Sequence, residues 1–312
     1  MKEGILERRW CHFIILLSFV VLCVGCSATK NVYKVVTFQK HETDSLKKRV
    51  LLLPFLDRAE LRQEQLQEMS DAFVARLNKD NSLLLERDSE PVSSTLKMRS
   101  PEYGIIIDPD QAGRARELGM NVLLMGIINP LEFHTKKSGI WPFRGTKREA
   151  EVSMFVNALD VTNDTLLLTH LESRKFRLHE ELTEWEEPDE QILRRGVDEE
   201  KLEKALADII KEQAEVLSET LDRLPWSGWI LSADDQEVLV NAGKDVGIVP
   251  GYVFDVYKRG EPIRSNTGKT YYLLGPKVGT IKTVEVLESS ASAVSLSDAL
   301  IEPGYIIRPS AN

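Results

Sequence analysis

Very few residues of this 312-residue sequence stand in a pattern that could do chemistry. The first candidate is Asn266-Thr267-Gly268-Lys269-Thr270, which ends like a phosphate-binding loop. That kind of loop also needs a glycine five residues before its Gly-Lys pair, where this chain has Ile263, and it needs a helix after it. Tyr271-Tyr272-Leu273-Leu274 is instead typical of a strand or turn. We therefore interpret the segment as a polar β-turn.

The histidines beyond residue 26 do not form a metal-binding pattern. No two of His41, His134, His170 and His179 stand four residues apart, and no His-Glu-x-x-His motif occurs. His170 lies among leucines, which favours a structural role. A Gly-x-Ser-x-Gly elbow is also absent from the sequence. We therefore predict no catalytic residue, no metal site and no cofactor, and we expect that the protein is not an enzyme.

All three cysteines, Cys11, Cys23 and Cys26, lie at the start of the chain. Lys2, Arg8 and Arg9 make this start basic. An apolar run of about a dozen residues follows; it is too short to span about 30 Å of hydrocarbon comfortably but suits the core of a signal peptide. The small residue Gly25 then precedes Cys26. Cleavage at that point would leave Cys26 as the only cysteine, so the mature chain would have no intramolecular disulfide and no CxxC metal site.

This arrangement resembles the lipobox of bacterial lipoproteins, in which a cysteine after a small residue receives diacylglycerol before cleavage. Leucine is usual three residues before that cysteine; this chain has Cys23 there and Leu22 one step earlier. Ser27 stands where retention signals for the inner membrane usually have Asp, which favours the outer membrane. The resemblance implies a signal peptide over 1–25 and lipidation of Cys26 by acyl chains such as palmitate. An ordinary cleaved signal or an uncleaved anchor is the alternative.

The chain is acidic, with a formal net charge of −9. Affinity for nucleic acid comes largely from lysines and arginines that neutralise phosphates, so we expect no nucleic-acid partner. No second apolar run approaches the roughly 18 residues that a spanning helix needs. Lipidated Cys26 is therefore the predicted link to a membrane.

Two folded domains are predicted after a polar tether over 26–48. Over 49–224, helical and alternating patterns predict an α/β domain. Its expected elements are strands at 49–55, 82–86 and 121–128, helices at 62–79 and 108–118, a hairpin over 151–177 and a long helix from Asp198 to about Leu224. In the hairpin, Val152, Met154, Val156 and Ala158 fall on one face.

Pro225 marks the boundary to the second domain, because no helical periodicity follows it. Short strands are expected at 228–232, 236–241, 252–258, 277–287, 290–296 and 304–308. Such short strands in fewer than about 90 residues predict a small all-β barrel over 225–312. The predicted fold class is therefore α+β, with an α/β sandwich-like domain and a C-terminal small all-β barrel.

Residues 49–224 resemble the α/β fold shared by the curli secretion lipoprotein CsgG and the N-terminal domain of TolB. The resemblance is carried by the opening strand Val50–Phe55, the helix-Gly-strand-Gly element Ala115–Gly126 and the hairpin segment Val156–Asp164. It implies the sandwich-like fold described above. The family usually shows a Thr-Gly turn in this hairpin, where the present chain has Thr162-Asn163.

Residues 226–312 resemble the C-terminal domain of the flagellar assembly protein FlgT. The run Val238–Tyr257 carries this resemblance, together with Val278–Ile281 and the closing Ile301–Tyr305. FlgT has a further N-terminal domain and is not, as a family, lipidated. The resemblance therefore implies the small barrel more strongly than a flagellar role.

Two surfaces are candidates for contact with partners. In the predicted basic loop 129–149, cations that include Lys136, Lys137 and Arg144 flank Ile140, Trp141 and Phe143. Aromatic residues beside cations suit a lipid headgroup zone or an acidic partner. The alternative is a loop whose tryptophan packs back on its own domain. The second surface, the acidic stretch Glu180–Glu190, is interpreted as a solvated loop.

The predicted function is that of a non-enzymatic, lipid-anchored protein of the outer membrane that faces the periplasm. Its two domains would bind other envelope proteins in a surface-appendage, flagellar or secretion assembly. Two alternatives stay open: a CsgG-like oligomeric export channel of the outer membrane, and a lipoprotein regulator of a cell-wall synthase. The sequence also leaves a homo-oligomer open.

Overall fold

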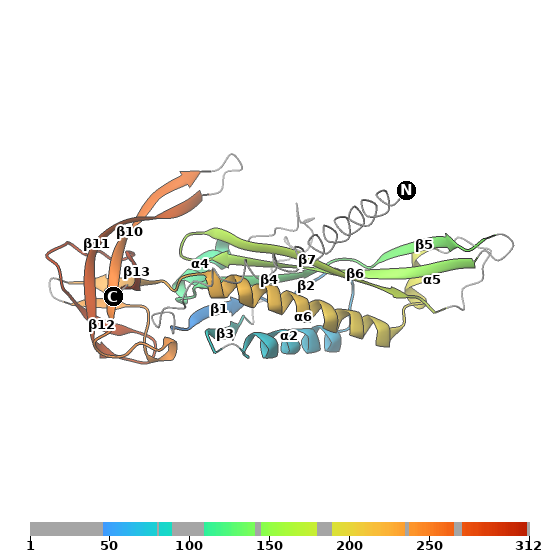
Figure 1. Cartoon of the computed structure of the whole chain (residues 1–312), viewed down its shortest axis with the longest axis horizontal. Helices are drawn as coiled ribbons and strands as arrows, with labels where there is room; N and C mark the ends of the chain where they lie inside the picture. The colour runs from blue at the N-terminus through green and yellow to red at the C-terminus, as the bar shows by residue number, and fades with distance from the viewer. Residues whose placement is uncertain are drawn as a thin grey trace, which may run out of the picture. The chain divides into compact units, whose positions relative to one another are not determined.

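The computed structural model describes residues 46–79, 81–88, 109–140, 145–179, 189–234, 237–264 and 270–310 (Figure 1). The chain from Ser45 onwards forms one compact unit. Cys26 and the predicted signal peptide lie outside the described residues. Within the described part of the chain, no helix combines the length and the hydropathy that are needed to cross a membrane.

The fold is α+β and ends in a closed barrel of six strands, as the sequence predicts. The first part contains β1 (Lys48–Leu52), β2 (Leu56–Asp57), α2 (Gln63–Leu77), β3 (Leu83–Arg87), α4 (Pro109–Glu117), β4 (Val122–Ile128), β5 (Glu132–Ser138), β6 (Gly145–Asp160), β7 (Thr165–Arg177), α5 (Glu190–Arg195) and α6 (Glu199–Arg223). The barrel contains β8 (Gly228–Ala233), β9 (Val238–Val240), the 3-10 helix η2 (Lys244–Val246), β10 (Val253–Arg264), β11 (Thr270–Val286), β12 (Ala291–Ser295) and β13 (Ile306–Pro309).

The first seven strands form one mixed sheet in the order β3-β1-β4-β6-β5, with β2 also on β4 and β7 also on β6. Strand β4 is buried at every position, because helices cover both of its faces. On one face, α2 and α6 enclose the largest core, around Phe73 and Ile209. On the other face, α4 places Ala112 and Ala115 against Leu123. The strands predicted at 49–55 and 121–128 thus lie next to each other in the middle of the sheet as β1 and β4.

Helix α6 begins where the sequence predicts, because the Asp198 side chain accepts a hydrogen bond from the backbone N–H of Lys201 at 3.3 Å. Its apolar residues Leu202, Leu206, Ile209, Leu217 and Leu221 are buried against the sheet, whereas Val216 is half-buried. Gln213, a polar residue, is also fully buried in this face. Its amide donates to the carbonyl oxygens of Met154 on β6, at 2.7 Å, and His170 on β7, at 3.2 Å. The buried amide therefore fixes the helix against both strands.

The basic segment 129–149 was predicted as a loop, and this prediction is wrong. Strands β5 and β6 pair across it in continuous register from Glu132 opposite Glu151 to Ser138 opposite Gly145. The composition of β5 is polar apart from Phe133, so its own residues do not signal a strand. Its conformation is set instead by β6, which runs on beyond β4 and offers β5 an edge to pair with. The result is a β-hairpin, which we call the basic hairpin.

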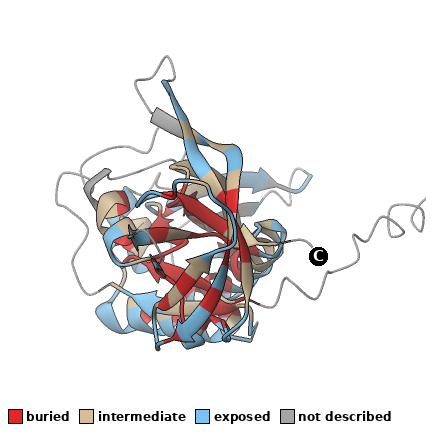
Figure 2. Ribbon diagram, turned by 90° about the vertical axis from the view of Figure 1, so that its left-hand side faces the viewer, coloured by how far each residue is buried: buried red, intermediate tan, exposed pale blue. Residues whose placement is uncertain are grey.

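The barrel closes in the order β10-β11-β12-β9-β8-β13 around a core that includes Phe254 and Ile281. Figure 2 shows buried stretches along the ribbon in the interior and exposed stretches around its outside. Strands β10 and β11 run further than predicted and leave the barrel as a two-stranded arm (Figure 1). A Cβ at Gly275 would lie 2.6 Å from the carbonyl oxygen of Lys258, so glycine permits the close strand approach there.

Arg49 joins the sheet to the barrel. Its guanidinium contacts the Asp245 carboxylate at 2.6 and 2.8 Å, and it donates to the carbonyl oxygens of Asn241 at 2.5 Å and Ser289 at 3.0 Å. Just before it in the chain, Leu46 falls within the predicted tether and packs in the barrel core at 1% exposure. The two parts of the unit therefore share buried contacts around the start of β1.

A second contact links the turn between β6 and β7 to the barrel arm. The backbone N–H of Tyr272 on β11 donates to the carbonyl oxygen of Asn163 at 3.1 Å. Asp164, at a φ of 54°, pairs with Arg116 of α4 and lies 3.6 Å from Arg259 of the arm. The Arg259 guanidinium stacks 3.6 Å from the centre of the Tyr272 ring. The predicted turn is thus also a docking point for the arm.

Candidate functional site

The residues predicted to contact a partner or a membrane belong to the basic hairpin, and the structure describes three of them. Lys136 and Lys137 are exposed on β5, and Ile140 is 83% exposed just beyond its end. Trp141, Phe143 and Arg144 lie outside the described residues, as does Cys26. The described part therefore shows an exposed isoleucine beside exposed lysines.

The outer part of the basic hairpin, from Lys136 to Lys147, has only positive charges in its sequence. Lys136 stands directly opposite Lys147. Like charges that face each other across two strands destabilise the pair. The sequence from Phe133 to Arg148 contains no acidic residue that could offset them. The far end of the hairpin thus presents a positively charged surface to a partner.

The base of the basic hairpin, in contrast, is an ion-pair network. The carboxylate of Glu151 lies 3.0 Å from Nε2 of His134 and 3.2 Å from Nζ of Lys175. A hydrogen bond with Ser173 lowers the pKa of Glu151 most, and Lys175 and His134 lower it further against the opposing effect of burial. Glu132, His134 and Glu151 each offer one ligand atom, and these three atoms lie within 4.8 Å of one another, as a metal site requires. Because Lys175 shares the Glu151 carboxylate, we interpret the group as a structural network that ties the hairpin to β7.

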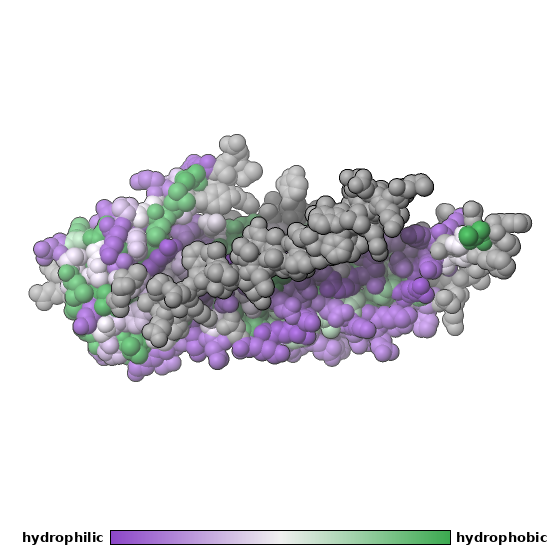
Figure 3. Space-filling view, in the orientation of Figure 1, coloured by the Kyte–Doolittle hydropathy of each residue, from purple (hydrophilic) through white to green (hydrophobic). Residues whose placement is uncertain are grey.

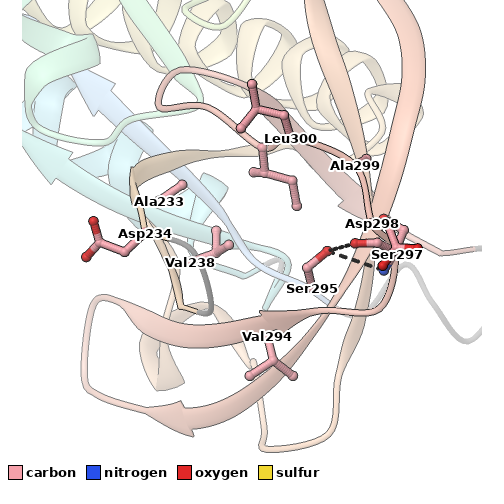
Figure 4. Close-up of a pocket in the computed structure, with 10 residues that line it drawn as sticks. Ala233, Asp234, Val238, Val294, Ser295, Ser297, Asp298, Ala299 and Leu300 are labelled. Atoms are coloured by element: carbon pink, nitrogen blue, oxygen red, sulfur yellow. Dashed lines mark hydrogen bonds between the residues drawn. The ribbon is translucent and has the colours of Figure 1, made fainter.

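A pocket of about 830 Å³ lies at one end of the barrel, where β8, β9 and β12 approach the loop that precedes β13. Figure 4 shows Leu300 and Val238 between its walls, with Asp234 and Asp298 on either side. The lining is small or apolar apart from these carboxylates and two serines. Its residues are Ala233, Asp234, Val238, Val294, Ser295, Ser297, Asp298, Ala299, Leu300 and Ile301.

The loop that lines the barrel pocket is held by its own serines. The Ser295 hydroxyl donates to the carbonyl oxygen of Ser297 at 2.6 Å and accepts from the Ser297 N–H at 3.3 Å. Leu300, further along the loop, is 77% exposed. Sequence reasoning missed this pocket because short strands and small residues give no motif. The signal that could have indicated it is charge, since residues 224–243 and 283–307 contain no Lys, Arg or His.

Exposed apolar side chains are concentrated in the barrel. Figure 3 shows hydrophobic surface over the barrel and a hydrophilic surface over α2 and α6. In the described residues, the large hydrophobic side chains exposed on the barrel and its arm are Leu231, Val249, Ile263, Leu273, Val284, Leu287, Leu296 and Leu300. Exposed apolar surface that gathers in one region is typical of a contact site.

Comparison with known proteins finds only weak similarity to solved structures. No family model and no curated protein matches the sequence. Among solved structures, the chain is similar to lipoprotein GNA1162 from Neisseria meningitidis, with 15% identity over 53% of this chain and 99% of that one, at a TM-score of 0.27. It is also similar to the PelC dodecamer from Paraburkholderia phytofirmans, with 14% identity over 57% and 90%, at a TM-score of 0.29. TolB from Acinetobacter baumannii matches with 8% identity over 82% of this chain and 62% of that one, at a TM-score of 0.27. These scores are too low to carry an inference about function.

Proposed function

We propose that the protein is a non-enzymatic lipoprotein of the bacterial envelope, which is anchored through Cys26 and binds other envelope proteins through its folded unit. The basic start, the short apolar core and the Gly25-Cys26 pair support the anchor. Ser27 favours the outer membrane, with the folded unit in the periplasm. The polar residues before Leu46 then act as the tether between lipid and fold.

The observation that carries the binding role is that highly exposed apolar side chains lie beside charges of one sign. The basic hairpin combines exposed lysines with Ile140, and the barrel pocket combines Asp234 and Asp298 with Leu300. When a partner covers an apolar side chain as exposed as Ile140 or Leu300, the burial of its surface favours binding. Flanking charges of one sign select the partner and its orientation.

Site-specific photocrosslinking in cells tests this role. A photoreactive amino acid at position 140 or 300 should give covalent adducts with envelope proteins that mass spectrometry can identify. The matched control is position 215, which is also exposed but lies on the hydrophilic face of α6. Adducts with lipid alone at 140 and 300, or equal protein adducts at all three positions, would contradict the proposal.

The two alternative functions predict other results. An export channel would conduct ions across a planar bilayer after reconstitution. A regulator of a cell-wall synthase would co-purify with the synthase and stimulate it in vitro. Either result would contradict protein assembly as the main role. Neither result would contradict the proposal that Cys26 carries a lipid anchor.

A further inference from the structure

The basic hairpin and the barrel pocket are complementary to each other. The described outer part of the hairpin contributes the exposed lysines Lys136, Lys137 and Lys147, and the sequence between Lys136 and Lys147 contains no acid. The pocket contributes Asp234 and Asp298, and its lining contains no cation. Among the described residues, Ile140 at 83% and Leu300 at 77% are the two most exposed large hydrophobic side chains. Each surface therefore offers one exposed apolar residue with charges of one sign, and the signs are opposite.

We propose that the basic hairpin of one copy of this chain docks in the barrel pocket of a second copy. Ile140 covers Leu300, and Lys136 and Lys147 face Asp234 and Asp298. This inference rests on the proposed function, because it names one partner of an assembly protein. The contact joins two different surfaces, so it repeats from copy to copy and produces a closed ring or an open filament.

Charge favours a second copy over a membrane as the occupant. The facing lysines Lys136 and Lys147 repel each other until anionic groups approach them. An anionic lipid surface would satisfy them but would leave the acidic, apolar pocket uncovered. A second copy satisfies both surfaces with one contact. The apolar pair supplies affinity in the centre, and the charged rim sets orientation and rate of association.

Two charge-reversed variants test the contact. Analytical ultracentrifugation of the purified full chain in detergent should show self-association that rises with concentration. The Asp234→Lys/Asp298→Lys variant and the Lys136→Glu/Lys147→Glu variant should each raise the dissociation constant about tenfold or more, because like charges then face each other. The second variant keeps a like-charge pair across the hairpin, so its internal repulsion is matched to that of the native hairpin.

Matched control variants lie on α6, where Lys211 and Glu215 are exposed on the hydrophilic face. Lys204→Glu/Lys211→Glu and Asp208→Lys/Glu215→Lys change the net charge by as much as the two test variants and should leave the dissociation constant unchanged. Circular dichroism should show the same spectrum for all variants. An equal loss of association in the control variants would overturn the proposal, because it would then reflect net charge.

A mixture of the two reversed variants gives the decisive result. The acidic hairpin of one variant fits the basic pocket of the other, and the unchanged hairpin and pocket also fit, so mixing should restore association of alternating copies. A damaged fold would not be rescued in this way. Failure of the mixture to associate would overturn the proposal.

Two further outcomes distinguish this inference from the proposed function. A native chain that stays monomeric at every concentration would overturn the inference, while photocrosslinks to other envelope proteins would still support the proposed function. Unchanged self-association in the Lys136→Glu/Lys147→Glu variant, with loss of binding to phosphatidylglycerol vesicles, would also overturn it. The basic hairpin would then be a membrane contact.

Discussion

Replacing Arg49 with Met should weaken the link between the sheet and the barrel. The Arg49 side chain is 9% exposed and Asp245 is 21% exposed, so both charges are largely withdrawn from water. Arg49→Met keeps the length of the side chain but removes its contacts with the carboxylate and with two carbonyl oxygens. Asp245 then remains partly buried without its charged partner.

The size of this effect follows from the burial of the pair. Removing one partner of a buried ion pair costs about 3–5 kcal/mol, largely because the remaining charge stays unpaired. Water reaches part of Asp245 and recovers some of this loss, so we expect a decrease of about 3 kcal/mol in the free energy of unfolding. The Arg87–Asp71 pair is a matched control, since its atoms also lie 2.6 Å apart but its side chains are 38% and 55% exposed.

Urea unfolding followed by circular dichroism measures the difference. Arg49→Met should unfold at a clearly lower urea concentration than the native chain, whereas Arg87→Met should unfold close to it. Hydrogen exchange in peptides from 226–243 should also become faster in Arg49→Met, because the barrel loses its attachment to β1. Equal midpoints for the two variants would refute the reasoning.

The remaining predictions concern packing and pH. Gly126→Ala should lower the free energy of unfolding by about 1–3 kcal/mol, because its Cβ would lie 2.6 Å from atoms of Phe55 and Met154. Gly113→Ala, which meets no atom within 4 Å in α4, should leave the melting temperature unchanged or raise it; equal losses in calorimetry would contradict this account. The lowered pKa of Glu151 contributes stability that is fully present above its usual value of 4.5 and is lost as the pH falls through the lowered value. The stability gap between the native chain and Glu151→Gln should therefore shrink below pH 4.5, and a gap that is constant with pH would argue against it.

Local patterns predict the centre of the fold well. Val152, Met154, Val156 and Ala158 are all buried on one face of β6, as their alternation indicates. The start of α6 follows from Asp198, whose capping hydrogen bond is a local interaction. The six barrel strands are predicted from turns between apolar runs, although β10 and β11 extend further than predicted. These features depend on residues that are close together in the chain.

Features that depend on distant residues could not be predicted from local patterns. Strand β5 is polar and becomes a strand only because β6 extends beside it. Arg49 stands at the start of a buried strand, yet its partner Asp245 lies 196 residues away. The barrel pocket is assembled from three strands and a loop, none of which carries a motif. The charge of the pocket can be predicted from the sequence, but the shape of the pocket depends on the closure of the barrel.

Intact-protein mass spectrometry of the chain purified from membranes tests the central claim most directly. The account predicts a mature protein that begins at Cys26 and carries diacylglycerol and acyl groups on that residue. Cys26→Ala should instead give an unprocessed precursor or a mature protein that leaves the membrane fraction. A native chain cleaved elsewhere, or an unmodified Cys26 in a chain that still fractionates with membranes, would contradict the lipid anchor.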